Sequence, residues 1–140
     1  MLTGPIIIIE DDADDQYIFQ KVLRELNVPN TIRFFDNGQL VLKYMQETEE
    51  QPFLIICDIN MPLMNGMELR RHVEQDAQLK KKIIPFIFLT TDASPDLIQE
   101  AYQVTIQGFF KKATGYEETK RQLEQIVGYW SLCLHPNSEW

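Results

Sequence analysis

The chain contains few of the residues that build disulfide frameworks or metal centres of the cysteine–histidine type. Its 140 residues include two cysteines, Cys57 and Cys133, and two histidines, His72 and His135. The cysteines lack the spacing of a zinc-binding motif, so free thiols in a reducing compartment are expected. Neither histidine has a catalytic partner visible in the sequence, and we expect both to be structural or exposed.

Long apolar runs are absent as well. No run reaches the roughly 18 apolar residues that a membrane span needs, and the first residues do not show the basic and apolar regions of a secretory signal. Hydrophobic residues nevertheless make up 44% of the chain, which is enough for the core of one domain. These features predict a cytoplasmic, single-domain protein that does not enter a membrane.

Positive charge is scarce. Thirteen Lys and Arg residues stand against 21 Asp and Glu residues, so the net charge is −8. No segment forms a stripe of Lys and Arg, and a surplus of negative charge repels the phosphates of nucleic acids. We therefore do not expect this chain to bind nucleic acid directly.

Short apolar segments alternate with longer amphipathic ones. The runs IIII and FLIIC show no polar alternation, which is typical of strands buried on both faces of a sheet. The expected strands are 6–9, 31–35, 53–57, 86–89 and 108–111, and the expected helices are 14–26, 40–45, 65–75, 95–103 and 114–129. Strands that alternate with helices predict a parallel sheet covered on both faces, an α/β fold of the open doubly wound type. Five such units are too few for an eight-stranded barrel.

Three residue pairs mark the starts of helices in this pattern. They are Asn65 with Glu68, Ser94 with Pro95, and Thr114 with Glu117. The first and third have the spacing of a capping box, and Ser94 followed by Pro95 is a favourable N-cap and first helical residue. Each pair predicts where the chain leaves a loop and becomes helical.

Charged and hydroxyl side chains follow the expected strands. They are Glu10 and Asp11 after the first strand, Asp58 after the third, Thr90 after the fourth, and Lys111 and Lys112 after the fifth. In an open doubly wound sheet, binding sites lie at this carboxyl edge, near the switch in strand order. If the first and third strands are neighbours, three carboxylates converge there and repel one another. A Mg²⁺ ion would offset that repulsion, and carboxylates, Mg²⁺, lysine and hydroxyl together are the parts that phosphoryl transfer requires.

The ordered segments IIIIED, CDINMPLMNG, LTT and GFFKK resemble the receiver domain of bacterial two-component response regulators, the CheY-like family. The resemblance covers about residues 5–129, and DINMPLMNG is its most specific part. It implies a five-stranded flavodoxin-like sheet with strand order 2-1-3-4-5. It also implies a receiver domain at 1–129 and a short tail at 130–140, without an output domain.

The resemblance assigns a role to each acidic residue of the site. Asp58 would be the phosphoacceptor, a carboxylate nucleophile that attacks phosphorus. Asp11 would bind Mg²⁺ directly and Glu10 through water, while Asp58 and the backbone carbonyl of Asn60 complete the ligands; Mn²⁺ would substitute. The remaining acids of the run EDDADD are expected to serve the first helix, with Asp12 as a loop or N-cap residue and the next two in its first turn.

The resemblance also implies a switch. Thr90 would hydrogen-bond the phosphoryl group, and Lys112 would pair with it electrostatically. Alternation along the strand turns only one of Lys111 and Lys112 toward the site, and matching the family pattern from Gly108 assigns that position to Lys112. Phe109 would be the switch aromatic, which moves as Thr90 moves and changes how the face built by 95–103, 108–111 and the last helix binds a partner. Phe109 lacks the hydroxyl of the tyrosine often found in the family, so packing alone would drive its rotation.

One residue departs from the family pattern. Proline usually follows the lysine, often with a cis peptide bond, whereas Ala113 follows Lys112 here. A cis bond before a residue other than proline costs roughly 3–4 kcal/mol. We therefore expect either a trans bond or a strained exception at this position.

The implied function is that of a single-domain response regulator, which accepts a phosphoryl group from a sensor histidine kinase on Asp58. It would catalyse its own phosphorylation and dephosphorylation without being a turnover enzyme. Its partners would be the kinase or a phosphotransfer protein, and a downstream protein or a second copy of the chain. The tail residues Tyr129, Trp130 and Leu132 would either pack on the domain or form an interface.

The alternative is a receiver-like interaction module that is never phosphorylated. Two other classes fit less well. A phosphatase of the haloacid-dehalogenase type needs a carboxylic acid where Asn60 stands, because an amide cannot donate the proton. A flavodoxin-like carrier would bring the phosphate of FMN against the acidic run at 10–15.

Overall fold

The computed structural model describes residues 4–137, and the predicted alternation of strands and helices is confirmed there. The elements are β1 (Ile6–Ile9), α1 (Ala13–Glu25), β2 (Ile32–Phe35), α2 (Gly38–Glu47), β3 (Leu54–Cys57), α3 (Gly66–Gln75), α4 (Ala77–Lys80), β4 (Phe86–Thr90), α5 (Pro95–Gln103), β5 (Gly108–Lys111) and α6 (Tyr116–Leu132). The short helix α4 was not predicted. Asp76 caps it by accepting hydrogen bonds from the backbone N–H groups of Gln78 and Leu79.

The five strands are parallel and lie in the order β2-β1-β3-β4-β5, as predicted. In the register, Ile9 lies opposite Cys57 of β3 and opposite Phe35 of β2. The residues that follow Ile9 and Cys57 therefore emerge side by side at the carboxyl edge of the sheet. This adjacency is the switch in strand order at which open α/β sheets bind ligands.

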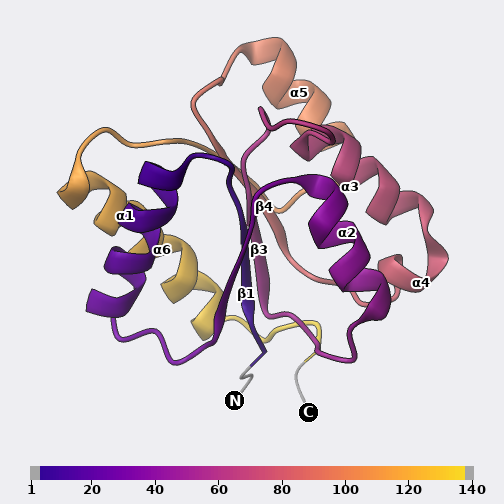
Figure 1. Cartoon of the computed structure of the whole chain (residues 1–140), viewed down its shortest axis with the longest axis horizontal. Helices are drawn as coiled ribbons and strands as arrows, with labels where there is room; N and C mark the ends of the chain where they lie inside the picture. Colours follow the sequence, from indigo (N-terminus) through magenta and orange to yellow (C-terminus); the bar gives the residue numbers. More distant parts are fainter. Residues whose placement is uncertain (1–3, 138–140) are drawn as a thin grey trace.

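Helices cover both faces of the sheet (Figure 1). Helices α1 and α6 pack on one face, and α2 to α5 lie on the other. Ile6 and Ile8 belong to the first core and Ile7 and Ile9 to the second, and none of the four is more than 1% exposed. A run of four isoleucines is therefore buried on alternate faces, and it fixes the position of the acidic residues that follow it.

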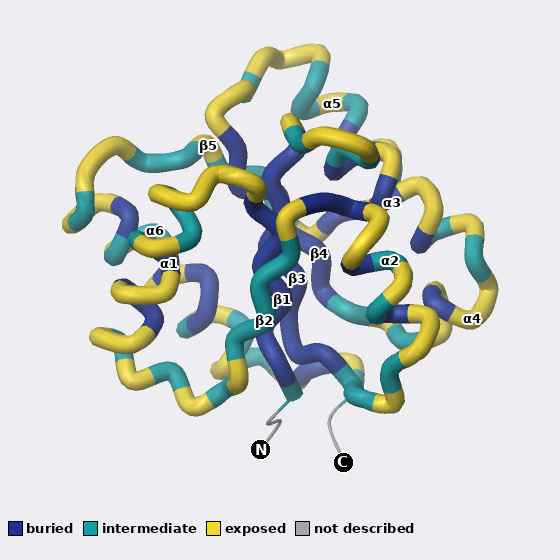
Figure 2. Tube along the Cα trace, in the orientation of Figure 1, coloured by how far each residue is buried: buried dark blue, intermediate teal, exposed yellow. Residues whose placement is uncertain are grey.

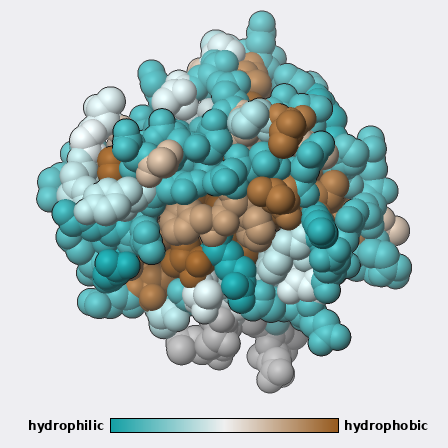
Figure 3. All heavy atoms as spheres, viewed as in Figure 1, coloured by the Kyte–Doolittle hydropathy of each residue, from teal (hydrophilic) through white to brown (hydrophobic). Residues whose placement is uncertain are grey.

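The central strands β1, β3 and β4 are fully buried, whereas the edge strand β2 is only half-buried (Figure 2). In the space-filling view the surface is mainly hydrophilic, and the apolar side chains in sight gather across the middle, over β2 (Figure 3). Within residues 4–137, no helix combines the length and the apolar character that crossing a membrane requires.

Two of the three expected helix starts are present. Asn65 and Glu68 form a complete capping box, and Ser94 caps α5 with Pro95 as its first residue. The expected capping box of Thr114 and Glu117 is wrong, because α6 begins only at Tyr116 and its N-cap is Gly115. Gly115 has a φ of +88°, a left-handed conformation that favours glycine, so the backbone turn determines this start.

Helix α6 continues to Leu132, past the expected end at residue 129, so the expected boundary between domain and tail falls inside a helix. Trp130 is half-buried against the core that α1 and α6 cover, whereas Tyr129 and Leu132 are 63% and 88% exposed. Of the two alternatives for these residues, packing on the domain therefore applies to Trp130 alone.

The segment after α6 is anchored by His135, which is 2% exposed. Its ring stacks on Phe53 with centroids 5.1 Å apart, and its Nε2 lies 2.7 Å from the Phe53 carbonyl oxygen. The Asn137 backbone N–H donates to Nδ1, so Nε2 carries the proton and donates to Phe53. His135 is thus a structural residue, as expected. Cys57 and Cys133 are both free thiols.

Candidate functional site

Three carboxylates converge at the carboxyl edge of the sheet. Glu10, Asp11 and Asp58 each contribute an oxygen that lies within 4.8 Å of the other two. Glu10 and Asp58 are buried, and Asp11 is exposed. The Asp58 backbone N–H donates to the Ile9 carbonyl at 2.9 Å, so the end of β3 is held against the end of β1. The strand order is the reason why residues nearly fifty positions apart meet here.

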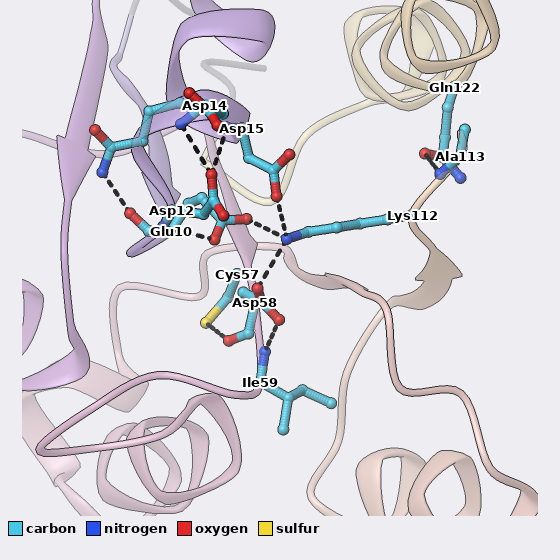
Figure 4. Close-up of polar contacts among 11 residues, drawn as sticks. Glu10, Asp12, Asp14, Asp15, Cys57, Asp58, Ile59, Lys112, Ala113 and Gln122 are labelled. Atoms are coloured by element: carbon cyan, nitrogen blue, oxygen red, sulfur yellow. Dashed lines mark hydrogen bonds and ion pairs between the residues drawn. The ribbon is translucent and has the colours of Figure 1, made fainter. Parts of the chain in front are cut away.

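The ammonium of Lys112 lies among these acids (Figure 4). Its Nζ is 2.5 Å from Glu10 Oε1, 2.8 Å from Asp15 Oδ2 and 2.9 Å from Asp58 Oδ2. The Lys112 side chain is only 10% exposed, whereas Lys111 is exposed. Of the two lysines, Lys112 therefore lies in the site, and its charge offsets part of the repulsion among the carboxylates.

This environment changes the acidity of Glu10 and Lys112. Burial raises the pKa of Glu10 to about 7, the hydrogen bond from Lys112 opposes that rise, and the charge of Asp58 adds to it. Burial by itself would lower the pKa of Lys112, but its hydrogen bonds to Asp15, Glu10 and Asp58 outweigh burial and raise that pKa. Lys112 consequently stays charged near neutral pH, and Glu10 binds its proton more tightly than an ordinary glutamate does.

The backbone around Asp58 is tightly packed. Asp58 Oδ1 accepts a hydrogen bond of 2.7 Å from the Ile59 N–H, and the Gly66 N–H donates to the Ile59 carbonyl at 2.9 Å. A Cβ at Gly66 would lie 2.3 Å from the Asp58 carbonyl oxygen. The first residue of α3 therefore lies directly against the backbone of Asp58.

Thr90, at the end of β4, is 0% exposed, and its Oγ has no hydrogen-bond partner among the described residues. Leaving such a buried hydroxyl unpaired costs roughly 1–3 kcal/mol, so this oxygen is suited to bond a group that enters the site. Asn60 lies in the exposed loop after Asp58.

Phe109 lies on β5, half-buried, with its ring centroid 6.1 Å from that of Phe88. It lines a surface hollow of about 500 Å³ that also involves Tyr102 from α5 and Tyr129 and Trp130 from α6. The hollow therefore lies on the face formed by α5, β5 and α6, which we call the α5–β5–α6 face.

Two polar residues beside Lys112 were not predicted to belong to the site. Asp12 caps α1 as expected, but Asp15 pairs with Lys112 in addition to lying in the first turn of the helix. Gln122 of α6 hydrogen-bonds the backbone next to Lys112. The described residues contain no cis peptide bond, so of the two geometries expected between Lys112 and Ala113 the trans bond is present.

The chain is similar to one known protein family over most of its length. The family described as the response regulator receiver domain matches residues 6–124. The chemotaxis protein CheY of Pseudomonas aeruginosa is 31% identical to the chain over 121 residues, which cover 86% of this chain and 94% of that protein. This similarity extends over nearly the whole length of both chains.

Solved structures share the fold. The phosphorylated cyanobacterial phytochrome response regulator RcpA is 25% identical, with a TM-score of 0.86 over 97% of this chain and 100% of that one. The Mn²⁺-bound form of response regulator Rcp1 has a TM-score of 0.83 at 23% identity, covering 95% of this chain and 99% of that one. The receiver domain of the Pseudomonas aeruginosa sensor kinase PA1611, with a magnesium ion in its active-site cleft, has a TM-score of 0.69 at 19% identity, covering 91% and 99%.

Proposed function

The chain belongs to the response regulator receiver domain family, and from this premise we propose that Asp58 accepts a phosphoryl group from a phosphohistidine of a sensor histidine kinase or a phosphotransfer protein. The observation that carries the proposal is the position of the Asp58 carboxylate, in contact with Lys112 and beside Glu10 and Asp11. In this reaction a carboxylate oxygen of Asp58 forms a bond to phosphorus while the bond from phosphorus to the histidine nitrogen breaks. The electron pair of that bond stays on the imidazole.

The acidic residues fit a hard divalent cation. Carboxylate oxygens within 4.8 Å of one another, on two buried residues and one exposed residue, suit Mg²⁺, which prefers oxygen ligands and keeps part of its water. Glu10, Asp11 and Asp58, with the backbone carbonyl of Asn60, would hold the ion, and Mn²⁺ would substitute. When bound, the ion supplies positive charge that stabilises the negative charge of the phosphoryl oxygens.

Lys112 and Thr90 would then bind the phosphoryl group. Lys112 already contacts the Asp58 oxygen at 2.9 Å and would transfer that ion pair to a phosphoryl oxygen. The unpaired Thr90 hydroxyl would donate a hydrogen bond to another phosphoryl oxygen. The movement of Thr90 toward that oxygen would make room for Phe109 to rotate inward. The α5–β5–α6 face would change with Phe109, and a downstream protein or a second copy of the chain would bind it with altered affinity.

The first test is phosphorylation of the purified chain by acetyl phosphate. With Mg²⁺ present, a phosphate-affinity gel is expected to show one retarded band, and EDTA is expected to remove it. A wild-type chain that gives no retarded band under these conditions, and none with a histidine kinase, would contradict the proposal. That result would favour an interaction module that is not phosphorylated.

Glu10 should make the stability of the metal-free protein depend on pH. Its pKa is about 7 in the folded chain, against an ordinary value of 4.5, so the folded state holds this proton more tightly than the unfolded chain. The stabilisation is complete below the ordinary pKa and is lost as pH rises through the folded pKa of about 7. In EDTA, the thermal midpoint measured by calorimetry is therefore expected to fall as the pH rises from weakly acidic to weakly alkaline.

Added Mg²⁺ should remove most of this fall, because it binds the folded state and compensates the ionised carboxylates. The control is Glu10→Gln, which cannot ionise at this position and should give a flatter pH profile in EDTA. An equally steep fall in Glu10→Gln would show that another group is responsible.

A further inference from the structure

The backbone on both sides of Lys112 is held by one side chain from another element. Lys112 follows the last paired residue of β5, and its N–H donates to the Thr90 carbonyl at 2.8 Å. The Gln122 Nε2 donates to the Lys111 carbonyl at 2.7 Å, and the Gln122 Oε1 accepts from the Ala113 N–H at 3.3 Å. A single amide of α6 therefore bonds the peptide group before Lys112 and the peptide group after it.

The two peptide groups determine the direction in which the Lys112 side chain leaves the backbone. The Lys112 N–H makes the last hydrogen bond to β4, no described residue after Lys111 is paired with that strand, and Gly115 turns the backbone into α6 shortly afterwards. Without the Gln122 amide, the Ala113 N–H would lose the only hydrogen bond that it makes within residues 4–137, and the Lys111 carbonyl would lose its bond to α6. Gln122 therefore holds the backbone from which the Lys112 side chain extends.

The far end of the side chain is held by carboxylates (Figure 4). The ammonium contacts Glu10 at 2.5 Å, Asp15 of α1 at 2.8 Å and Asp58 at 2.9 Å. Asp15, Lys112 and Gln122 line one small hollow of about 150 Å³ between α1 and the start of α6. A displacement of the Lys112 backbone would therefore change the distances between its ammonium and these acids, including the distance to Asp58.

We propose that Gln122 is a positioning residue of the phosphoryl site, which acts by orienting Lys112 toward Asp58. The proposal rests on the proposed function, because it assigns Gln122 a role in the reaction of Asp58. Gln122 does not touch the reacting atoms, and the Mg²⁺ ligands lie on other elements. Its loss should therefore slow the reaction while leaving metal binding intact.

The test compares Gln122→Met with the wild type. Methionine has a similar length and helix propensity but cannot form either hydrogen bond. The rate of phosphorylation by acetyl phosphate is expected to fall roughly tenfold, since a misplacement of about 1 Å in a reacting site can cost up to a hundredfold. The dissociation constant for Mg²⁺, measured by calorimetry, should stay unchanged. Gln20→Met, the same replacement at an exposed position of α1, should react at the wild-type rate.

The decisive measurement is a double-mutant cycle with Lys112→Ala. If Gln122 acts through Lys112, Gln122→Met should have no further effect on the rate in the Lys112→Ala background. An equal slowing in both backgrounds, or a wild-type rate for Gln122→Met, would overturn the inference while the proposed function stands. A wild-type chain that is not phosphorylated at all would instead refute the proposed function. Hydrogen exchange at the Ala113 amide of the wild-type protein gives an independent check, because fast exchange there would also overturn the inference.

Discussion

Replacing Asp58 by asparagine is expected to abolish the retarded band completely. The amide of asparagine is neutral and is a far weaker nucleophile than a carboxylate, so no acyl phosphate can form at this position. The fold should tolerate the change, because an asparagine carbonyl can still accept the hydrogen bond that Asp58 Oδ1 receives from the Ile59 N–H. The Asp58→Asn protein should therefore fold normally and show less than roughly 1% of the wild-type modification, a loss of the size seen when a nucleophile is removed.

The measurement is the phosphate-affinity gel, supported by intact mass spectrometry of the same samples. Asp96→Asn is the matched control, because Asp96 is exposed in the first turn of α5 and contacts none of the site residues. It should give a band of wild-type strength. A band of that strength in Asp58→Asn would place the phosphoryl group on another residue and would refute the assignment of Asp58.

Replacing Gly66 by alanine is expected to destabilise the protein strongly. The added Cβ would lie 2.3 Å from the Asp58 carbonyl oxygen, 2.9 Å from Cε1 of Phe88 and 3.0 Å from Cα of Ile59. Two of these neighbours are backbone atoms, which cannot rotate away as a side chain can. Overpacking of a close-packed interior typically costs 1–3 kcal/mol, and we expect Gly66→Ala to lie at the upper end, at about 3 kcal/mol of unfolding free energy.

Urea denaturation measures this loss directly. Gly128→Ala is the matched control, since a Cβ at Gly128 in α6 meets no atom within 4 Å. Alanine should stabilise the helix there by roughly 0.5–1 kcal/mol. The same substitution is therefore expected to lower the unfolding free energy at position 66 and to raise it at position 128. If Gly66→Ala unfolds with the same urea midpoint as the wild type, the close approach of α3 to the Asp58 backbone is not a rigid feature of the fold.

Local patterns in the sequence were sufficient to predict most of the helices and strands. The isoleucine run of β1 and the capping box of Asn65 and Glu68 act within a few residues, and both are present in the structure. The expected meeting of Glu10 and Asp58 followed from a general rule, that parallel strands end at one edge of the sheet. The pattern of Thr114 and Glu117 failed because the left-handed turn at Gly115 decides where α6 begins.

The missed contacts depend on distant parts of the chain. Asp15 and Lys112 are 97 positions apart, and His135 and Phe53 are 82 positions apart. Asp15 also has an ordinary local explanation as an acid in the first turn of a helix, so nothing in its neighbourhood indicated a second role. The sequence around Gln122 contains no recognisable motif either. The two hydrogen bonds of Gln122 can be identified only from the structure of the turn before α6.

Both ends of the described chain are attached to one residue, and that attachment bears on how the fold can be rearranged. The Phe53 N–H donates to the Pro5 carbonyl at 2.8 Å, and the Phe53 carbonyl accepts from His135 at 2.7 Å. Phe53 precedes β3 and Asp58 follows it, so the two ends meet at the edge of the sheet opposite the carboxylates. Neighbouring ends on the surface are what circular permutation and domain insertion require. This domain could therefore be inserted into a surface loop of a host protein, and its acidic edge would then face away from the two junctions.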